Sequence, residues 1–307
     1  MAYVTTRDGV KLYYEQTGKG TPVVFVHELA GDCRSWEPQL RFFGRRYRCI
    51  AFNARGYPPS DVPRARARYS QQIVADDVAD VVRGLKLRNA HLVGSAMGSN
   101  TVLHCGLRQP RMARSLTAIN AGIGSDRDKR AQFERDIETQ ARRIETLGLE
   151  DAFRDHRVGP SRVQFQNKDP RGFEEFARRT VELSATGYAH TFRGVLGKRP
   201  PLYALEKDLR RLKVPLLLVT GDEDDKCLEP GLFIKRACPS AALAVVPWSG
   251  HLINLEEPDF FNRLLLDFLT LVDSGRWRPR DPRSTHLSVL ANRGQDYTRR
   301  KHAAQNR

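Results

Sequence analysis

Residues 91–98 have the sequence His-Leu-Val-Gly-Ser-Ala-Met-Gly, and this stretch decides the fold. The apolar residues before Gly94 predict a strand buried on both faces, and a helical pattern begins directly after the turn. Gly94 and Gly98 flank position 96, so the turn is tight and the helix packs closely against the strand. Residue 96 is therefore expected at the apex of a strand–turn–helix, raised above the edge of a sheet.

The same style of strand recurs on both sides of this turn, with helical patterns in between. Alternation of this kind indicates an α/β protein with a doubly wound sheet. An opening hairpin is expected around Asp8-Gly9. The predicted buried strands are residues 22–27, 47–52, 90–94, 115–120, 215–220 and 242–247, and the predicted helices are 35–43, 70–86, 97–109, 230–237 and 256–272.

One segment interrupts the alternation. Residues 124–200 carry charged helical patterns and no buried strand run, which predicts an all-helical insertion. It should lie over the carboxyl ends of the strands, where open α/β sheets bind ligands. The predicted division is a core in two parts, residues 1–123 and 201–273, with the insertion at 124–200. Residues 274–307 are expected to form a basic, weakly ordered tail.

Five short motifs in chain order resemble the α/β-hydrolase fold family, in particular its lidded esterases, lactonases and C–C hydrolases. The resemblance covers residues 2–273 and implies a mostly parallel eight-stranded sheet, helices on both faces and an all-helical lid at 124–200. The motifs are Val26-His27-Glu28-Leu29, the loop 52–60 (FNARGYPPS), Gly94–Gly98, Gly221-Asp222-Glu223-Asp224, and Ser249-Gly250-His251 followed by Glu256-Glu257-Pro258.

Position 96 departs from this family, because the chain has Ala96 where the family has Ser, Asp or Cys. Ser95 does not replace it, since its flanking residues would have to be glycines and are Val93 and Met97. Two origins of Ala96 compete: an engineered replacement of a serine, or natural loss of the nucleophile. Alanine keeps the backbone strain of the apex, which a lineage freed from catalysis could relax with Gly or Asn. The engineered replacement is therefore favoured.

The resemblance implies a role for each of the remaining site residues. A serine at position 96 would attack an acyl carbon, His251 would transfer the proton, and Asp224 would orient the imidazole. Spacing from Gly221 selects Asp224 among the four carboxylates of residues 222–225. The backbone N–H groups of Leu29 and Met97 would form the oxyanion hole.

The walls of the substrate pocket are expected among the aromatic residues near these motifs. Glu28 stands where the family usually has Gly, and its carboxylate is expected to point away from the oxyanion hole, toward Arg55. Arg55 itself is more consistent with stabilising its loop than with binding an anion. The candidate substrate-binding residues are Trp36, Tyr57, Phe165, Tyr188, His190, Phe192 and Trp248.

Composition excludes several classes of function. The chain has 307 residues and a formal net charge of +15 at pH 7, but no nucleic-acid motif and no apolar run long enough to cross a membrane. No phosphate-binding loop, dinucleotide-binding motif or metal-ligand spacing occurs, so no cofactor and no metal are expected. The five cysteines show no disulfide or metal pattern, and the N-terminus lacks a signal peptide, which favours a cytoplasmic protein.

The sequence thus predicts a serine hydrolase for a small ester or lactone, present as a nearly inactive variant with alanine at position 96. The basic charge permits an anionic substrate. Two alternatives stay open: a non-catalytic ligand-binding protein, and a cofactor-free dioxygenase or lyase in which His251 acts as a base. The acyl and leaving groups, the oligomeric state and the role of the tail do not follow from the sequence.

Overall fold

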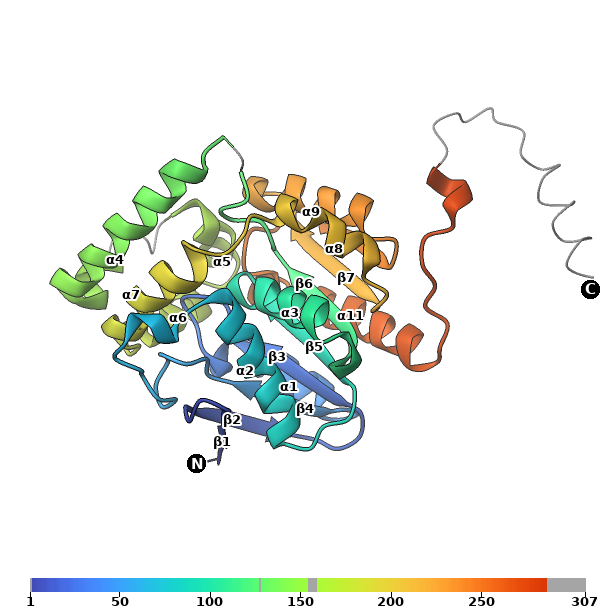
Figure 1. Ribbon diagram of the computed structural model, residues 1–307, viewed down its shortest axis with the longest axis horizontal. Coiled ribbons are helices and arrows are strands. Elements are labelled where there is room, and N and C mark those ends of the chain that lie inside the picture. The colour runs from blue at the N-terminus through green and yellow to red at the C-terminus, as the bar shows by residue number, and fades with distance from the viewer. Residues whose placement is uncertain (1, 127, 154–158, 286–307) are drawn as a thin grey trace, which may run out of the picture.

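The computed structural model describes residues 2–126, 128–153 and 159–285, which are organised around one eight-stranded sheet (Figure 1). The strand order is β1-β2-β4-β3-β5-β6-β7-β8, and all strands after β2 run parallel. The predicted fold class and the opening hairpin are therefore confirmed. The strands are β1 (Ala2–Thr5), β2 (Lys11–Thr17), β3 (Pro22–Val26), β4 (Arg48–Phe52), β5 (Ala90–Ser95), β6 (Ala113–Ile119), β7 (Leu216–Gly221) and β8 (Ala241–Val246).

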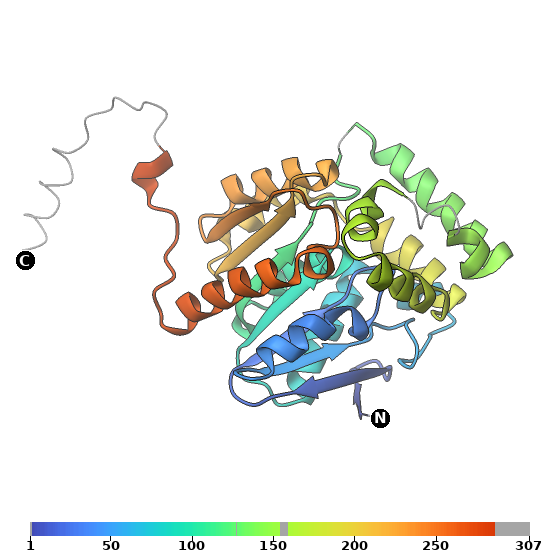
Figure 2. The ribbon, with the colours of Figure 1, turned by 180° about the vertical axis from the view of Figure 1, so that it is seen from behind.

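Helices cover both faces of the sheet (Figures 1 and 2). Helices α2, α3, α8 and α9 pack on one face, and α1 and α11 pack on the other. The helices are α1 (Glu37–Phe43), α2 (Gln71–Gly84), α3 (Met97–Arg108), α4 (Arg130–Phe153), α5 (Val163–Lys168), α6 (Pro170–Val181), α7 (Ala185–Thr191), α8 (Glu206–Arg211), α9 (Asp225–Ala237), α10 (Ile253–Glu256) and α11 (Pro258–Asp273).

The alternation of side chains along β3 explains why the parallel strands are continuous apolar runs. Val24 and Val26 join the core between the sheet and helices α2 and α3. Val23 and Phe25 point the other way, into the core under α1 and α11. Because both faces are covered, side chains on both sides of such a strand are buried, and most of them are apolar.

The turn between β5 and α3 is as tight as its glycines indicate. A Cβ atom on Gly94 would lie 2.2 Å from the carbonyl oxygen of Gly98, and one on Gly98 would lie 2.1 Å from that of Val26. Any larger residue at either position would push α3 away from β3 and β5. Ala96, between them, has φ 51° and ψ −103°, in the left-handed half of backbone space.

The chain between β6 and α8 is helical in every described segment, and we call its residues 124–200 the helical insertion. It packs on loops that follow the carboxyl ends of β3 and β4. The Thr180 hydroxyl donates to the carbonyl oxygen of Ala30 at 2.9 Å, and Gly187 lies against the backbone of Gly56. Figure 1 shows α4, α6 and α7 gathered at this end of the sheet.

Two boundaries differ from the sequence prediction. Helix α9 begins at Asp225 rather than at residue 230, because its first turns are polar and contain Pro230, which gave no helical signal. The first residues of the predicted tail also pack against the core, where a weakly ordered segment was expected. Trp277 packs on Phe268 with ring centroids 4.8 Å apart, and the N–H of Arg280 donates to Pro239 at 2.8 Å. The predicted tail residues after 285 lie outside the described residues.

All five cysteines are buried and unpaired, as predicted. Burial raises the pKa of the thiols of Cys49 and Cys105 to about 12, so these groups stay protonated. None of the described helices is both long enough and apolar enough to cross a membrane.

A buried ion-pair network ties the loop after β4 to the rest of the core. The Arg55 guanidinium, 1% exposed, bonds to Asp77 at 2.6 Å and to Asp8 at 2.9 Å. Burial raises the pKa of Asp77 to about 6 although Arg55 opposes the rise, whereas Arg55 lowers the pKa of Asp8 to about 2. Arg55 thus stabilises its loop, which confirms that interpretation over an anion-binding role.

We expect Arg55→Gln to lower the free energy of unfolding by about 3 kcal/mol at neutral pH, since it leaves the Asp77 carboxylate buried without a cation. The difference in unfolding free energy between parent and variant should grow as the pH rises above about 6. Above that pH Asp77 ionises beside Arg55 in the parent protein, whereas in the variant it has no cation and ionises less readily. Urea denaturation at several pH values measures this.

Arg88→Gln, at an exposed arginine, is the matched control and should change the stability little. A deficit that is equal for both variants, or that shrinks with rising pH, would contradict this account of Arg55.

Candidate active site

The apex of the turn, Ala96, is fixed by its backbone. Its N–H donates to the carbonyl oxygen of Ile119 at 2.8 Å, and its own carbonyl oxygen accepts from the Ser99 hydroxyl at 2.6 Å. Ser95 is the last residue of β5 and is buried, and its hydroxyl has no partner among the described residues. Position 96 is thus the apex, and Ser95 precedes it inside the strand.

Asp224 and His251 form a buried hydrogen-bonded pair. The Nδ1 atom of His251 lies 2.6 Å from Oδ2 of Asp224, and the two residues are 4% and 7% exposed. Burial by itself would raise the pKa of the Asp224 carboxyl, but His251 and the thiol of Cys227 lower it below its ordinary value. The carboxylate accepts a hydrogen bond from the Nδ1–H group, which leaves Nε2 of the imidazole as a base.

Asn120 holds the turn and the histidine loop next to each other. Its side-chain nitrogen donates to the carbonyl oxygen of Gly250 at 3.0 Å, and its oxygen accepts from the N–H of Gly221 at 3.0 Å. The preceding residue, Ile119, is the one that binds Ala96. Ala96 and Gly250, the residue before His251, are therefore hydrogen-bonded to two consecutive residues at the end of β6, Ile119 and Asn120.

Glu256 fixes the histidine loop from the other side. Its carboxylate accepts from the N–H of Gly250 at 2.6 Å and from that of Leu252 at 2.8 Å, the two residues that flank His251. Burial raises the pKa of Glu256, while these two backbone donors oppose the rise. The carboxylate thus sets the direction of the imidazole without touching it.

Cys227 completes the surroundings of the pair. Ligand atoms of Asp224, Cys227 and His251 all lie within 4.8 Å of one another, and the thiol contacts the carbonyl oxygen of Asn120 at 3.3 Å. Burial raises the pKa of this thiol well above its ordinary value, so it donates a hydrogen bond as a neutral group. These three are the one donor set in the described residues compact enough for a metal ion, and two of their ligand atoms already form the His251–Asp224 hydrogen bond.

The expected oxyanion loop is held by three residues. The Nε2 atom of His27 accepts from the N–H of Ala54 at 3.0 Å, and the Tyr57 hydroxyl donates to the carbonyl oxygen of Leu29 at 2.9 Å. Glu28 bonds to the N–H of Ala30 within its own loop and not to Arg55, so the expected Glu28–Arg55 contact is wrong.

The two expected oxyanion donors have free N–H groups. Met97 is the first residue of α3, where N–H groups have no partner within the helix. The N–H of Leu29 has no backbone or side-chain partner among the described residues. Both are therefore available to a ligand oxygen.

Four of the candidate substrate-binding residues lie beside these elements. Tyr57, Tyr188 and Phe192 belong to one apolar cluster with Leu29 and Met97. Phe165 belongs to a second cluster with Ala30 and with Leu252, the neighbour of His251.

The other three candidates lie elsewhere. Trp36 packs on Phe25 in the core between the sheet and α1, with ring centroids 5.0 Å apart. The Nε2 atom of His190 bonds to the carbonyl oxygen of Arg64 at 3.0 Å. Trp248 is 68% exposed, with the Lys168 ammonium over its ring. Their contacts are therefore with these partners, and their role in substrate binding stays a prediction.

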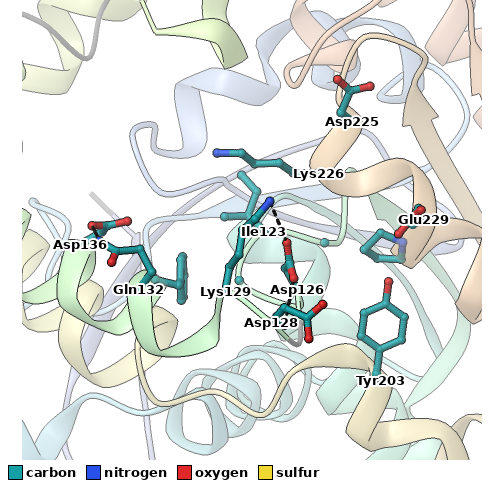
Figure 3. Close-up of a pocket in the computed structure, with 14 residues that line it drawn as sticks. Ile123, Asp126, Asp128, Lys129, Gln132, Asp136, Tyr203, Asp225, Lys226 and Glu229 are labelled. Carbon is teal, nitrogen blue, oxygen red and sulfur yellow. Dashed lines mark hydrogen bonds and ion pairs between the residues drawn. The ribbon is translucent and has the colours of Figure 1, made fainter.

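A cavity of about 550 Å³ lies on the far side of Asp224, at the junction of the helical insertion and α9. Figure 3 shows the carboxylates of Asp126, Asp128 and Asp136 and the phenol of Tyr203 around it, with Lys226 and Glu229 from α9. Neither position 96 nor His251 lines it. No sequence motif predicted this cavity.

The fold and this geometry define a class of protein, and comparison with known proteins agrees. A family model described as the alpha/beta hydrolase fold matches residues 21–258, and the chain belongs to that family. It is 25% identical to 3-oxoadipate enol-lactonase 1 of Acinetobacter baylyi (87% of this chain, 96% of the relative). It is 30% identical to a putative carbamate hydrolase, RutD, of Agrobacterium fabrum (84% and 97%).

A solved structure, the enol-lactonase of Burkholderia xenovorans LB400, superposes with a TM-score of 0.77 at 21% identity, covering 88% of this chain and all of that one. The family and the fold predicted from the sequence are thus confirmed.

The short contact between His251 and Asp224 should give a strongly deshielded Nδ1 proton in the NMR spectrum. We expect this resonance to disappear in Asp224→Asn, because the amide is a weaker acceptor than the carboxylate. Asp225→Asn, one residue further along, should leave it unchanged. Persistence of the signal in Asp224→Asn would show that another group orients the imidazole.

Proposed function

We propose that this site is built to hydrolyse a small carboxylic ester or lactone through a nucleophile at position 96. The observation that carries the proposal is the 2.6 Å contact between His251 and Asp224, set beside a strained apex that holds only a methyl group. Such a pair serves to take a proton from a neighbouring hydroxyl and return it to a leaving group.

With serine at position 96, each group would have a defined task. The hydroxyl oxygen would bond to the acyl carbon while its proton passes to Nε2 of His251, and the imidazolium would then protonate the leaving alkoxide. Asp224 would stabilise the imidazolium. The N–H groups of Leu29 and Met97 would bind the oxyanion, each contributing about 2.7–4 kcal/mol to the transition state. Water would hydrolyse the acyl-enzyme by the same route.

The chain with Ala96 cannot take the first step, and we infer that it binds substrate without acyl transfer. A replaced serine accounts for the positive φ at Ala96, which costs about 1–3 kcal/mol and serves a nucleophile rather than a methyl group. The Asp224–His251 pair is likewise retained. The codon in the source gene decides the origin: a serine codon supports replacement, and an alanine codon indicates natural loss and a ligand-binding protein.

The relatives support the choice of substrate class. One is named a lactonase and another a putative carbamate hydrolase, and both names denote hydrolysis at an acyl carbon. At 25% and 30% identity they point to the kind of bond rather than to the substrate.

We expect Ala96→Ser to raise kcat for short aryl esters or lactones by on the order of 10³- to 10⁶-fold, since loss of a nucleophile in serine hydrolases costs that much. Release of nitrophenol from acetyl and butyryl esters, and lactone opening followed by pH, measure it.

The added variant His251→Ala should abolish the gain, whereas Ser95→Ala should leave it intact. No turnover by Ala96→Ser across esters, lactones and β-diketones would refute the proposal.

A second candidate function is general-base catalysis without a nucleophile, and the intact His251–Asp224 pair beside Ala96 favours it. His251 would then remove a proton from a C–H or O–H group of the substrate, as a lyase or a cofactor-free dioxygenase requires. This candidate predicts that the chain as it stands turns over such a substrate, and that His251→Ala abolishes turnover while Ala96→Gly does not. Activity that requires serine at position 96 would exclude it.

A further inference from the structure

Arg162, in the helical insertion, is a buried cation that has no counter-ion among the described residues. Its side chain is 7% exposed, and one terminal guanidinium nitrogen has no hydrogen-bond partner. It makes no ion pair or side-chain hydrogen bond among the described residues. Two other buried arginines, Arg55 and Arg193, bond to carboxylates. Arg199 has no ion pair among the described residues, but it donates to the carbonyl oxygen of Ile123, whereas Arg162 has no side-chain hydrogen bond there.

A cation of this kind is costly to bury. Removing a guanidinium from water without a compensating anion costs several kcal/mol, so a fold that only needed packing here would place an apolar residue. Contact with the face of Phe176, 5.3 Å from the guanidinium carbon to the ring centroid, offsets a part of this cost only. An anion from outside the protein would complete the pairing of this charge.

Arg162 lies over the candidate active site. Its neighbour Gln164 packs on Gly250, the residue before His251. Phe176, on which the guanidinium rests, shares an apolar cluster with Ala30 of the oxyanion loop and with Leu252 of the histidine loop. The cation is thus placed on the insertion side of the two loops that would surround a bound acyl group.

Tyr188 brings a second unsatisfied group to the same loops. The residue is 1% exposed, and its hydroxyl has no partner among the described residues. Its ring packs near Tyr57, which itself bonds to Leu29. Burial, together with the nearby Tyr57 phenol and Glu28 carboxylate, raises the pKa of this phenol well above its ordinary value, and the Arg162 charge opposes the rise. The hydroxyl is therefore a neutral donor.

We propose that Arg162, assisted by the Tyr188 hydroxyl, binds a free carboxylate of the substrate. This inference rests on the proposed function and narrows it: the substrate is a half-ester, or a lactone bearing a carboxylate, rather than a neutral ester. A guanidinium matches a planar carboxylate with two parallel hydrogen bonds, and a phenol adds a third donor. One cation and one hydroxyl fit a singly charged group better than a phosphate dianion.

Equilibrium binding to the chain as it stands tests this without any turnover. Titration calorimetry compares monomethyl glutarate with methyl pentanoate, which has the same length but a methyl group in place of the carboxylate. We expect Arg162→Gln to weaken binding of the half-ester about 10- to 100-fold, the strength of charge-assisted hydrogen bonds, and to change binding of the neutral ester little.

Two further variants separate recognition from structure. Arg178→Gln removes an exposed arginine from the same insertion and should leave both affinities unchanged. The Tm of Arg162→Gln should be equal to or above that of the parent, because the variant removes a buried unpaired charge. Tyr188→Phe should weaken half-ester binding by less than Arg162→Gln.

Equal affinity for the two esters, no saturable binding of the half-ester, or an equal loss in Arg162→Gln and Arg178→Gln would overturn the inference. So would a lowered Tm of Arg162→Gln with half-ester selectivity retained. The proposed function fails separately, when Ala96→Ser hydrolyses nothing although Arg162-dependent binding persists. Tighter binding of a phosphate monoester than of the half-ester would also overturn the assignment to a carboxylate.

Discussion

The close approach of α3 to β3 and β5 is the constraint on which the rest of the structure depends. Only hydrogen atoms fit between Gly94 and the backbone of Gly98, and between Gly98 and Val26. Because the helix is held so near the sheet, the single residue between them must take a positive φ, and position 96 is forced upward. The first N–H groups of α3 then point to the place where a ligand oxygen would sit.

Around that apex, buried polar groups are arranged so that each satisfies the next. Asn120 joins the ends of β6 and β7 to the histidine loop, Glu256 accepts hydrogen bonds from the two peptides around His251, and Asp224 accepts a hydrogen bond from the imidazole. Buried polar networks are stabilising only when they are completely paired. Arg162 and Tyr188 are among the buried groups with a polar atom that has no partner in the described residues, and both contact the elements around the candidate site.

Site positions that depend on backbone geometry could be predicted from the sequence. The apex at position 96, and Asp224 and His251 after the ends of β7 and β8, follow from glycines and from the point at which an apolar run ends. Residues whose position depends on side-chain direction could not be read in this way. Trp36 and Trp248 follow the same motifs along the chain, yet one packs in the core under α1 and the other lies at the surface.

The sequence by itself determined the class of fold and the place of Ala96 at the apex of the turn, because continuous apolar runs and paired glycines leave the backbone few alternatives. Only the tertiary structure decided which polar groups are paired. Arg162 is one of many arginines in a charged helical segment, and its pattern resembles that of its exposed neighbours. What distinguishes it is its burial beside Phe176, which packs with Ala30 and Leu252, while the described residues supply no anion to it.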